Sequence, residues 1–433
     1  MTDVLRALRL VPIVAVLVVA FSPPAWAQRA SVKEIVKADP QAEGMSAERL
    51  RRISAWLKQE VDDGKAPGAV VVVARRGKIV YQESLGMLDK DRGTPMRPDA
   101  IFRIASMTKP IVSVATMMLV EEGKLKLSDP VSLHLPELKD LKVAKDPTFK
   151  TTETDPARSM TLHDLLRHSA GFTYWFIGPK GPIQTRYQDD DIDGLHSLDG
   201  AQMLKKLADI PLLAQPVTTF NYSVSTDVLG HVLERVTGKG LDRILDEMVH
   251  TPLGMKDTAF SVSSEKQARL AQPFAADPDM WIFKWLDVSK PPKRFSGGAG
   301  LASTARDYQR FAQMIANGGV LNGTRLLSPK TVRYMTSDHL GIGIGGPIAK
   351  GPAFLPGDGY GFGLGFAVRV ADGLSPLLGS KGDAHWGGIT GPAFWIDSQE
   401  ELLTVLMVQA PRQRFYNRMV LRNLVYGAMT QAR

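Results

Sequence analysis

The chain has 433 residues, of which 44% are hydrophobic and 23% are charged; these proportions are typical of a globular protein with a large core and argue against disorder. It contains no cysteine, which excludes a disulfide, a cysteine nucleophile and a thiolate metal site. The formal net charge is +8, but Lys and Arg are scattered and form no cluster interleaved with aromatic residues, so we expect a solvated basic surface and no nucleic-acid partner.

The first 27 residues are typical of a secretory signal peptide. Arg6 and Arg9 precede an apolar run at 11–21, and Ala25-Trp26-Ala27 offers a small-x-small cleavage site. The apolar run is shorter than the roughly 20 residues that a membrane-spanning helix needs. We therefore expect export to the periplasm or the medium, a mature chain beginning near Gln28, and no stable membrane span after the signal is removed.

The next hundred residues predict a helix, a hairpin and a second helix. Helical periodicity over 46–64 begins at Ser46, a plausible N-cap residue. Two β-rich runs, 69–74 and 78–84, flank a short turn and predict a β-hairpin. The apolar run at 111–120 predicts a buried helix that ends at Gly123. Ser106 should therefore lie at the junction between a loop and this helix.

The middle of the chain is predominantly helical. The segment 161–172 predicts one short helix, and 223–249 predicts two more. The stretches 135–158 and 174–200 are polar, and the second is also rich in Gly, Pro and Asp, so both predict long surface loops. In an enzyme, such loops often form walls of the active site.

The last third returns to strands. A helical stretch at 304–319 precedes two strand-rich segments, 360–370 and 393–409, and a last helix is expected from about 412 to 429. Strands at both ends of the chain predict a single sheet assembled from distant segments. We expect one domain over 28–433, with an α/β lobe from about 46–104 and 295–430 and an inserted helical lobe at about 105–294.

The segment "RIASMTKPIV" suggests nucleophilic chemistry. A serine hydroxyl needs an adjacent base, and residues three apart on a helix share a face, so Lys109 can reach Ser106 Oγ. An amine in apolar surroundings at a helix N-terminus is disfavoured as a cation by desolvation and by the helix dipole. The alternative is that Ser106 caps the helix and Lys109 is a solvated first-turn residue.

Several further segments bear on this choice, among them "LLRHSAGF", "FNYSVSTDVLGHVLERVTG", "GGAGLASTARDYQRFAQMIANGG" and "AHWGGITGPAFWID". Together with "FRIASMTKP", they make the chain from about 46 to 425 resemble the penicillin-recognising serine hydrolases. That family includes class C β-lactamases, D-alanyl-D-alanine carboxypeptidases and, most similar to this chain, family VIII carboxylesterases. The resemblance implies the β-lactamase-like fold, in which helices flank an antiparallel sheet.

The resemblance also implies roles for individual residues. Ser106 matches the acylated nucleophile, Lys109 the lysine that activates it, and Tyr222 the tyrosine that exchanges a proton with the lysine and protonates the leaving group. The oxyanion hole is expected to comprise the backbone N–H groups of Ser106 and Ile389. The alternative for Tyr222 is a structural role, as a buried tyrosine whose hydroxyl is hydrogen-bonded to the backbone.

Two departures from the β-lactamase pattern concern the substrate. Val224 stands where those enzymes have an asparagine, so an amide donor is missing. Trp386-Gly387-Gly388 replaces their Lys-Thr-Gly, and tryptophan cannot supply the charge of that lysine. The Trp-Gly-Gly form resembles the family VIII esterases. Lys381, five residues upstream, could supply the charge, but a surface turn is the more natural place for it.

The remaining candidates carry less information. Tyr174, in "TYWF", is expected to help form an apolar acyl pocket or to anchor its loop, and His385 to line the pocket beside Trp386. His163 and His168 are five residues apart, which does not suit two metal ligands on one helix face. The run "DDDID" at 189–193 does not have the spacing of a calcium loop and is expected to be a solvated acidic turn. No metal or organic cofactor is implied.

The sequence thus predicts an exported serine hydrolase that cleaves carboxylic esters with small acyl groups. Two rivals remain: a β-lactamase or D-alanyl-D-alanine carboxypeptidase, and a binding or sensor protein that keeps the fold without turnover. The natural substrate and the oligomeric state are not determined by the sequence.

Overall fold

One antiparallel sheet forms the centre of the α/β part. The computed structural model describes residues 35–146, 153–178, 180–341, 344 and 357–432, so the predicted signal peptide lies outside the described residues. The sheet has eight strands in the order β10-β11-β12-β13-β14-β1-β2-β3. Their bounds are β1 Gly68–Arg75, β2 Lys78–Asp89, β3 Thr94–Pro95, β10 Tyr360–Phe362, β11 Ala367–Arg369, β12 Ala384–Gly387, β13 Ala393–Asp397 and β14 Leu402–Val408. The predicted sheet made from both ends of the chain is therefore confirmed.

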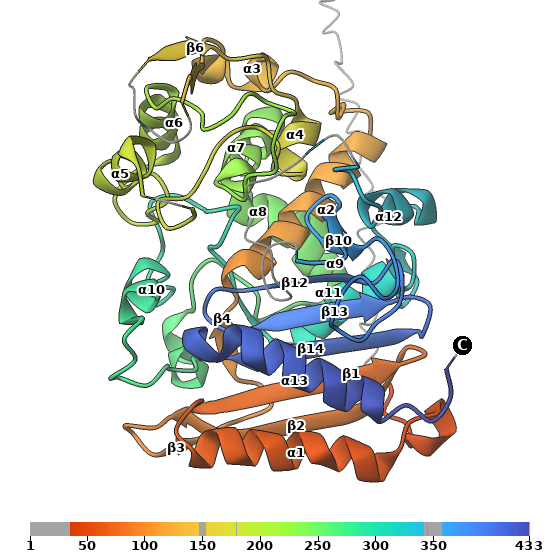
Figure 1. Cartoon of the computed structure of the whole chain (residues 1–433). Helices are drawn as coiled ribbons and strands as arrows, with labels where there is room; N and C mark the ends of the chain where they lie inside the picture. The colour runs from red at the N-terminus through yellow and green to blue at the C-terminus, as the bar shows by residue number, and fades with distance from the viewer. Residues whose placement is uncertain (1–34, 147–152, 179, 342–343, 345–356, 433) are drawn as a thin grey trace, which may run out of the picture. The chain divides into compact units, whose positions relative to one another are not determined.

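Strand β1 joins the two halves of this sheet. It pairs with β14, where Val72 lies opposite Val405, and with β2 on its other edge. Every residue of β1 is buried, because helices cover both faces of the sheet. Val71 and Val73 pack with α1 (Ala47–Asp62) and α13 (Arg414–Gly427), which lie together on the near side in Figure 1. Alternate residues pack into the main core, which includes α11 (Ala305–Ala316).

The predicted local signals are found in α1 and α2. Ser46 is the N-cap of α1, and its hydroxyl accepts the backbone N–H of Arg49. Helix α2 (Thr108–Glu121) is buried along almost its whole length, as its apolar sequence predicts. It packs against α7 (Ser225–Thr237) and α8 (Leu241–Leu245) in the helical part of the chain.

Shorter elements complete the described residues. The remaining helices are α3 Val131–His134, α4 Leu162–Leu166, α5 Pro182–Asp189, α6 Gly200–Ala208, α9 Thr251–Leu253, α10 Met280–Trp285 and α12 Pro329–Met335. The remaining strands are β4 Ile101–Arg103, β5 Lys142–Ala144, β6 Thr154–Pro156, β7 Ala302–Thr304, β8 Val320–Leu321 and β9 Thr324–Arg325. Short 3-10 or π turns are η2 Gln41–Glu43, η3 Ala105–Met107, η4 Pro136–Leu138, η5 Asp246–His250, η6 Ser264–Arg269 and η7 Pro411–Gln413.

The two predicted polar loops contain regular structure. The first contains the hairpin β5–β6, and the second contains α5 and the start of α6. The prediction of irregular loops was wrong here because short elements with polar exposed faces lack a clear periodicity. Across the ranges that the structure covers, no helix is both long enough and apolar enough to cross a membrane.

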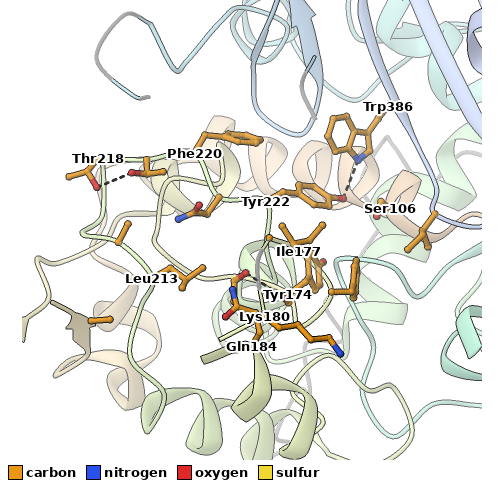
Figure 2. Close-up of a pocket in the computed structure, with 18 of the residues that line it drawn as sticks. Ser106, Tyr174, Ile177, Lys180, Gln184, Leu213, Thr218, Phe220, Tyr222 and Trp386 are labelled. Carbon is orange, nitrogen blue, oxygen red and sulfur yellow. Dashed lines mark hydrogen bonds between the residues drawn. The ribbon is translucent and has the colours of Figure 1, made fainter. Parts of the chain in front are cut away.

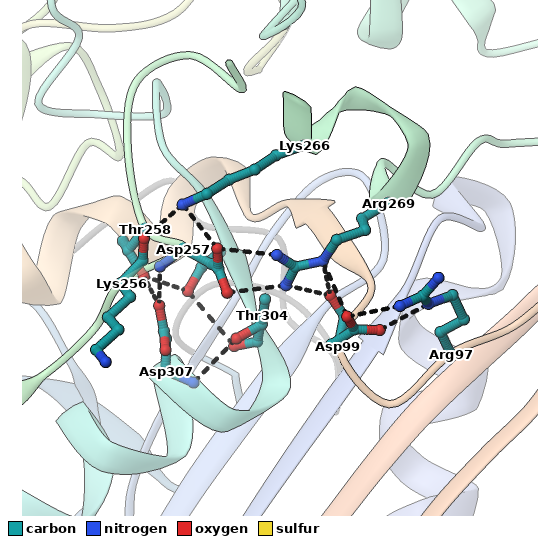
Figure 3. A network of polar contacts seen from close by, with 10 residues as sticks. Arg97, Asp99, Lys256, Asp257, Thr258, Lys266, Arg269, Thr304 and Asp307 are labelled. Atoms are coloured by element: carbon teal, nitrogen blue, oxygen red, sulfur yellow. Dashed lines mark hydrogen bonds and ion pairs between the residues drawn. The ribbon is translucent and has the colours of Figure 1, made fainter. Parts of the chain in front are cut away.

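A polar network fixes the strand that leads to Ser106 (Figure 3). Arg269 of η6 donates to both carboxylate oxygens of Asp257, at 3.1 and 2.8 Å, and to the backbone carbonyl of Asp99, at 2.9 and 2.6 Å. Asp307 of α11 accepts the backbone N–H of Asp257 at 2.7 Å. Because β4 follows Asp99 and pairs with β7 next to α11, this network ties η6 and α11 to the base of the candidate site.

A second cluster lies behind β12. Asp383 is completely buried, and its carboxylate lies 2.8 Å from Nε of Arg369 and 2.7 Å from Nη2 of Arg422. The Tyr360 hydroxyl donates to the same carboxylate at 2.9 Å. One buried carboxylate therefore pairs with two buried guanidinium groups and links β11, the start of β12 and α13.

Replacing Asp383 by Ala should lower the free energy of unfolding by about 3 kcal/mol or more, because it leaves two buried cations without an anion. Urea denaturation followed by circular dichroism measures this loss. The control is Arg235→Ala, which removes the exposed pair with Glu137 and should cost less than about 1 kcal/mol. Equal losses in the two variants would contradict the assigned role of Asp383.

Candidate active site

Ser106 lies where β4 turns into α2. It belongs to the 3-10 turn η3, directly ahead of the first turn of α2, as the sequence predicts. The preceding residue, Ala105, has a φ of 45°, a left-handed conformation that is unusual for a residue with a side chain. Such strain is often found next to reactive groups that the fold must present in one orientation.

Lys109 reaches back from α2 to Ser106. Its Nζ lies 3.4 Å from Ser106 Oγ, 3.0 Å from the Tyr174 hydroxyl and 2.7 Å from the carbonyl oxygen of Gly298. The side chain is fully buried, and this burial lowers the pKa of Lys109 to about 7, although the negative charge of Asp227 acts in the opposite direction. Near neutral pH the amine is therefore unprotonated in a substantial fraction of molecules and can accept a proton.

Tyr222 also lies beside this amine and contacts Trp386 (Figure 2). Its ring centroid is 4.5 Å from Lys109 Nζ, and its hydroxyl accepts a hydrogen bond from the indole N–H of Trp386 at 3.3 Å. Burial raises the pKa of Tyr222 well above its usual value, while hydrogen bonds with Ser106 and Trp386 act to lower it. The hydroxyl thus keeps its proton at neutral pH and can donate it to a departing group.

The Trp386-Gly387-Gly388 segment, referred to below as the third motif, leads into a tight turn at 388–391 that packs against the residues before Ser106. The Gly388 N–H donates to the Pro392 carbonyl at 2.8 Å, and the Thr390 hydroxyl donates to the Arg103 carbonyl at 2.7 Å. A Cβ atom on Gly388 would lie 2.6 Å from the carbonyl oxygen of Ile104, so only glycine fits there. This packing holds the 388–391 turn beside the Ser106 segment, and Ser106 and Ile389 line the same pocket. The oxyanion hole formed by their N–H groups stays a prediction.

Ser106, Tyr222 and Trp386 line one end of a pocket of 1210 Å³, and the fully buried Lys109 lies behind its surface. Figure 2 shows it extending from Ser106 and Trp386 past Tyr222 and Phe220 toward Leu213 and Thr218. Both predicted polar loops contribute to its lining, the first through the β5–β6 hairpin and the second through residues 174–184. On the side of α13, the lining residues are Arg414, Phe415 and Arg418.

Among the residues predicted for the site, His385 requires a correction. Trp386, Gly387, Gly388, Ile389 and Tyr174 line the pocket together with Ser106 and Tyr222, but His385 does not. Side chains alternate along a strand, so β12 directs its histidine away when its tryptophan faces the pocket. The imidazole of His385 packs at a right angle against the ring of Tyr360, 4.7 Å between centroids. Lys381 also lies outside the lining, in a turn after β11.

The acidic run at 189–193 also differs from its prediction. Asp193 is 3% exposed, and burial raises its pKa to about 8. It lies near Asp227 and Arg294, close enough for their charges to act on it. The expected solvated turn is therefore wrong for this residue, since the last carboxyl of the run points into the core.

Sequence reasoning missed most of the groups around the lysine. Tyr174 was expected at the substrate and lines the pocket, but its hydroxyl also contacts Lys109 directly. Gly298 and Asp227 were not singled out, although each lies within a segment that was quoted for the family resemblance. The paired glycines at 297–298 were the available signal, because glycine often marks a close approach of two backbones.

Comparisons with known proteins identify the family of this chain. The family model described as Beta-lactamase matches residues 53–425. An uncharacterized protein of Mycobacterium tuberculosis is 36% identical over 82% of this chain and 88% of its own length. Esterase EstB of Burkholderia gladioli is 33% identical over 85% of this chain and 93% of its own.

A solved structure shows the same fold. EstCE1, described as a hydrolase with promiscuous acyltransferase activity, superposes with a TM-score of 0.72 at 28% identity. The superposition covers 89% of this chain and 100% of the other. On the family match and the esterases among its relatives, the chain belongs to the β-lactamase family and is a serine hydrolase of small substrates.

Proposed function

We propose that the protein is an exported esterase that cleaves carboxylic esters through an acyl-enzyme on Ser106. The observation that carries this proposal is the fully buried Lys109 amine, which lies 3.4 Å from Ser106 Oγ and whose pKa is lowered by burial to about 7. A buried amine of lowered pKa next to a hydroxyl has the properties of a general base that activates a nucleophile.

In acylation, Lys109 takes the proton of Ser106 as Oγ attacks the ester carbonyl. The negative charge that develops on the carbonyl oxygen is stabilised by the backbone N–H groups of Ser106 and Ile389. Tyr222 donates its proton to the alkoxide that leaves, and the lysine ammonium returns a proton to the tyrosine. The alcohol then departs and the acyl group remains on Ser106.

In deacylation, a water molecule attacks the acyl carbonyl with the same groups in reversed roles. Tyr222 accepts the proton of the water while it passes its own proton to Lys109, and the oxyanion forms at the same two N–H groups. The lysine ammonium then returns this proton to Ser106 Oγ as the acid leaves. No metal or organic cofactor takes part in this scheme.

Trp386 supports esters over β-lactams as substrates. At the position where the β-lactamase pattern has a cation, this chain has a buried indole whose N–H is directed to the Tyr222 hydroxyl. A neutral donor cannot attract a substrate carboxylate as an ammonium group does. The esterase relatives, EstB and the lovastatin esterase of Penicillium rubens, support the same substrate class.

The purified mature protein should hydrolyse p-nitrophenyl butyrate with a kcat/KM far above that for the β-lactam nitrocefin. Replacing Ser106 by Ala should abolish ester hydrolysis and leave the circular dichroism spectrum unchanged, because only the nucleophile is lost. Residual activity above a few per cent would show that another residue is the nucleophile. Comparable or faster nitrocefin hydrolysis would instead assign the protein to the β-lactamases.

The kcat/KM for the ester should rise with pH through an apparent pKa of about 7 and reach a plateau above it, because only the neutral form of Lys109 accepts a proton. An ordinary lysine, with a pKa of about 10.4, would place this rise far above neutral pH.

Pre-steady-state acylation of Lys109→Ala should be slower by on the order of 10²-fold or more. An unchanged acylation rate would exclude Lys109 as the base.

Expression of the full chain in a Gram-negative host should give a periplasmic protein whose N-terminus is near Gln28. Intact-mass measurement of the periplasmic fraction tests this expectation. The matched control is Ala27→Glu, which places a charge at the predicted cleavage site and should leave the leader attached. A full-length protein confined to the cytoplasmic fraction would contradict export.

A further inference from the structure

Asp227 lies beside Gly298, whose carbonyl is hydrogen-bonded to the amine of Lys109. It is in the first turn of α7, five residues after Tyr222, and is 2% exposed. Its Oδ1 accepts a hydrogen bond from Nη1 of Arg294 at 3.0 Å and another from the Ser296 hydroxyl at 2.5 Å. A carboxylate this deeply buried is stable only with such partners.

Ser296 connects Asp227 to the backbone turn whose carbonyl binds the lysine. While its hydroxyl donates to Asp227, the same oxygen accepts the backbone N–H of Ala299 at 3.0 Å, which closes the turn at 296–299. The carbonyl oxygen of Gly298, inside this turn, accepts the shortest of the hydrogen bonds described for Lys109 Nζ, at 2.7 Å. Two hydrogen bonds and one turn thus connect Asp227 to the amine.

The turn lies so close to α7 that no side chain fits at positions 297 and 298. A Cβ atom on Gly297 would lie 2.3 Å from the carbonyl oxygen of Thr226. A Cβ atom on Gly298 would lie 2.3 Å from Oδ2 of Asp227 and 2.8 Å from the Tyr174 hydroxyl. Gly297 and Gly298 therefore allow the turn to lie against α7 and Asp227 while the Gly298 carbonyl accepts the hydrogen bond from the lysine.

The charges around Lys109 come from several segments. Besides Asp227, the titratable or charged groups near Lys109 are Ser106 and Tyr222 at the reacting centre and Tyr174 and His168 from the segment after α4; Asp193 and Arg294 act on Asp227 itself. The charge of Asp227 opposes the effect of burial and raises the pKa of Lys109. Arg294 partly compensates for that charge.

From this arrangement we propose that Asp227 is a positioning residue for the general base, which it holds through Ser296 and the Gly298 carbonyl while its charge tunes the amine. This inference rests on the proposed role of Lys109. It goes further by assigning a function to a residue that has no contact with the reacting atoms. The geometry predicts an effect on the position of Lys109, and the charge predicts an effect on its pKa. Two variants separate these effects.

Asp227→Asn removes the charge and keeps a similar shape. Ester kcat/KM should fall, and its rise with pH should move to lower pH by at least about half a unit, because a lysine without a nearby anion loses its proton more readily. Ser296→Ala keeps the charge and breaks the connection to the turn. Its kcat/KM should fall by about tenfold with the rise at an unchanged pH, because a misplaced base loses rate without a change in its own ionisation.

Asp307→Asn is the control for the loss of any buried aspartate. Asp307 is also 2% exposed and hydrogen-bonded, but it belongs to the network of Figure 3, away from the pocket lining. Its replacement should lower the melting temperature without moving the pH profile. All variants are compared as the mature protein with p-nitrophenyl butyrate, after circular dichroism has verified folding.

The outcomes distinguish this inference from the proposed function. If the wild-type profile rises near pH 7 but Asp227→Asn leaves that rise in place, Asp227 does not tune the lysine and the inference is overturned. An unchanged kcat/KM in Ser296→Ala overturns the positioning chain, even if Asp227→Asn does not fold. A wild-type profile without the rise, or activity retained in Ser106→Ala, would instead refute the proposed function.

Discussion

The chemistry proposed for this protein depends on the burial of one amine. Lys109 has no solvent exposure, and desolvation is the main cause of its lowered pKa. An amine loses hydration when it is buried, so the protein must supply hydrogen-bond acceptors without supplying enough negative charge to protonate it. The hydroxyls of Ser106 and Tyr174 and one backbone carbonyl meet this requirement, while the charge of Asp227 is shared with Arg294.

The rest of the fold holds this environment together. The residues around the amine come from α2, the segment after α4, the start of α7 and the turn before β7, so four distant parts of the chain must converge within a few ångströms. The sheet contributes a fifth part through the turn at 388–391, which is hydrogen-bonded to the Arg103 carbonyl at the end of β4. Rigid placement of this kind is what catalysis by a fixed base and fixed N–H donors requires.

The third motif shows how one substitution changes the electrostatics of a shared fold. In this chain Trp386 presents an N–H to Tyr222 in place of a charged amine, and its ring packs 5.2 Å from the tyrosine ring. The neighbouring guanidinium of Arg418 lies against Gly387 and donates to the Gly388 carbonyl at 2.7 Å. The motif is thus held by packing and backbone hydrogen bonds, and the indole contributes a dipole where a lysine would contribute a charge.

The sequence by itself determined the local features of this protein. The Ser46 cap, the buried helix after Ser106, the strands at both ends and the spacing of Ser106 and Lys109 follow from helical and strand periodicity, which is a property of neighbouring residues. Only the tertiary structure decided that Tyr174 contacts the lysine, that His385 faces away from the pocket, and that Asp193 is buried. These facts depend on how loops fold against distant segments and on which face of a strand meets the pocket. Neither is encoded in the spacing of nearby residues, because contacts across a fold are set by the packing of the whole core.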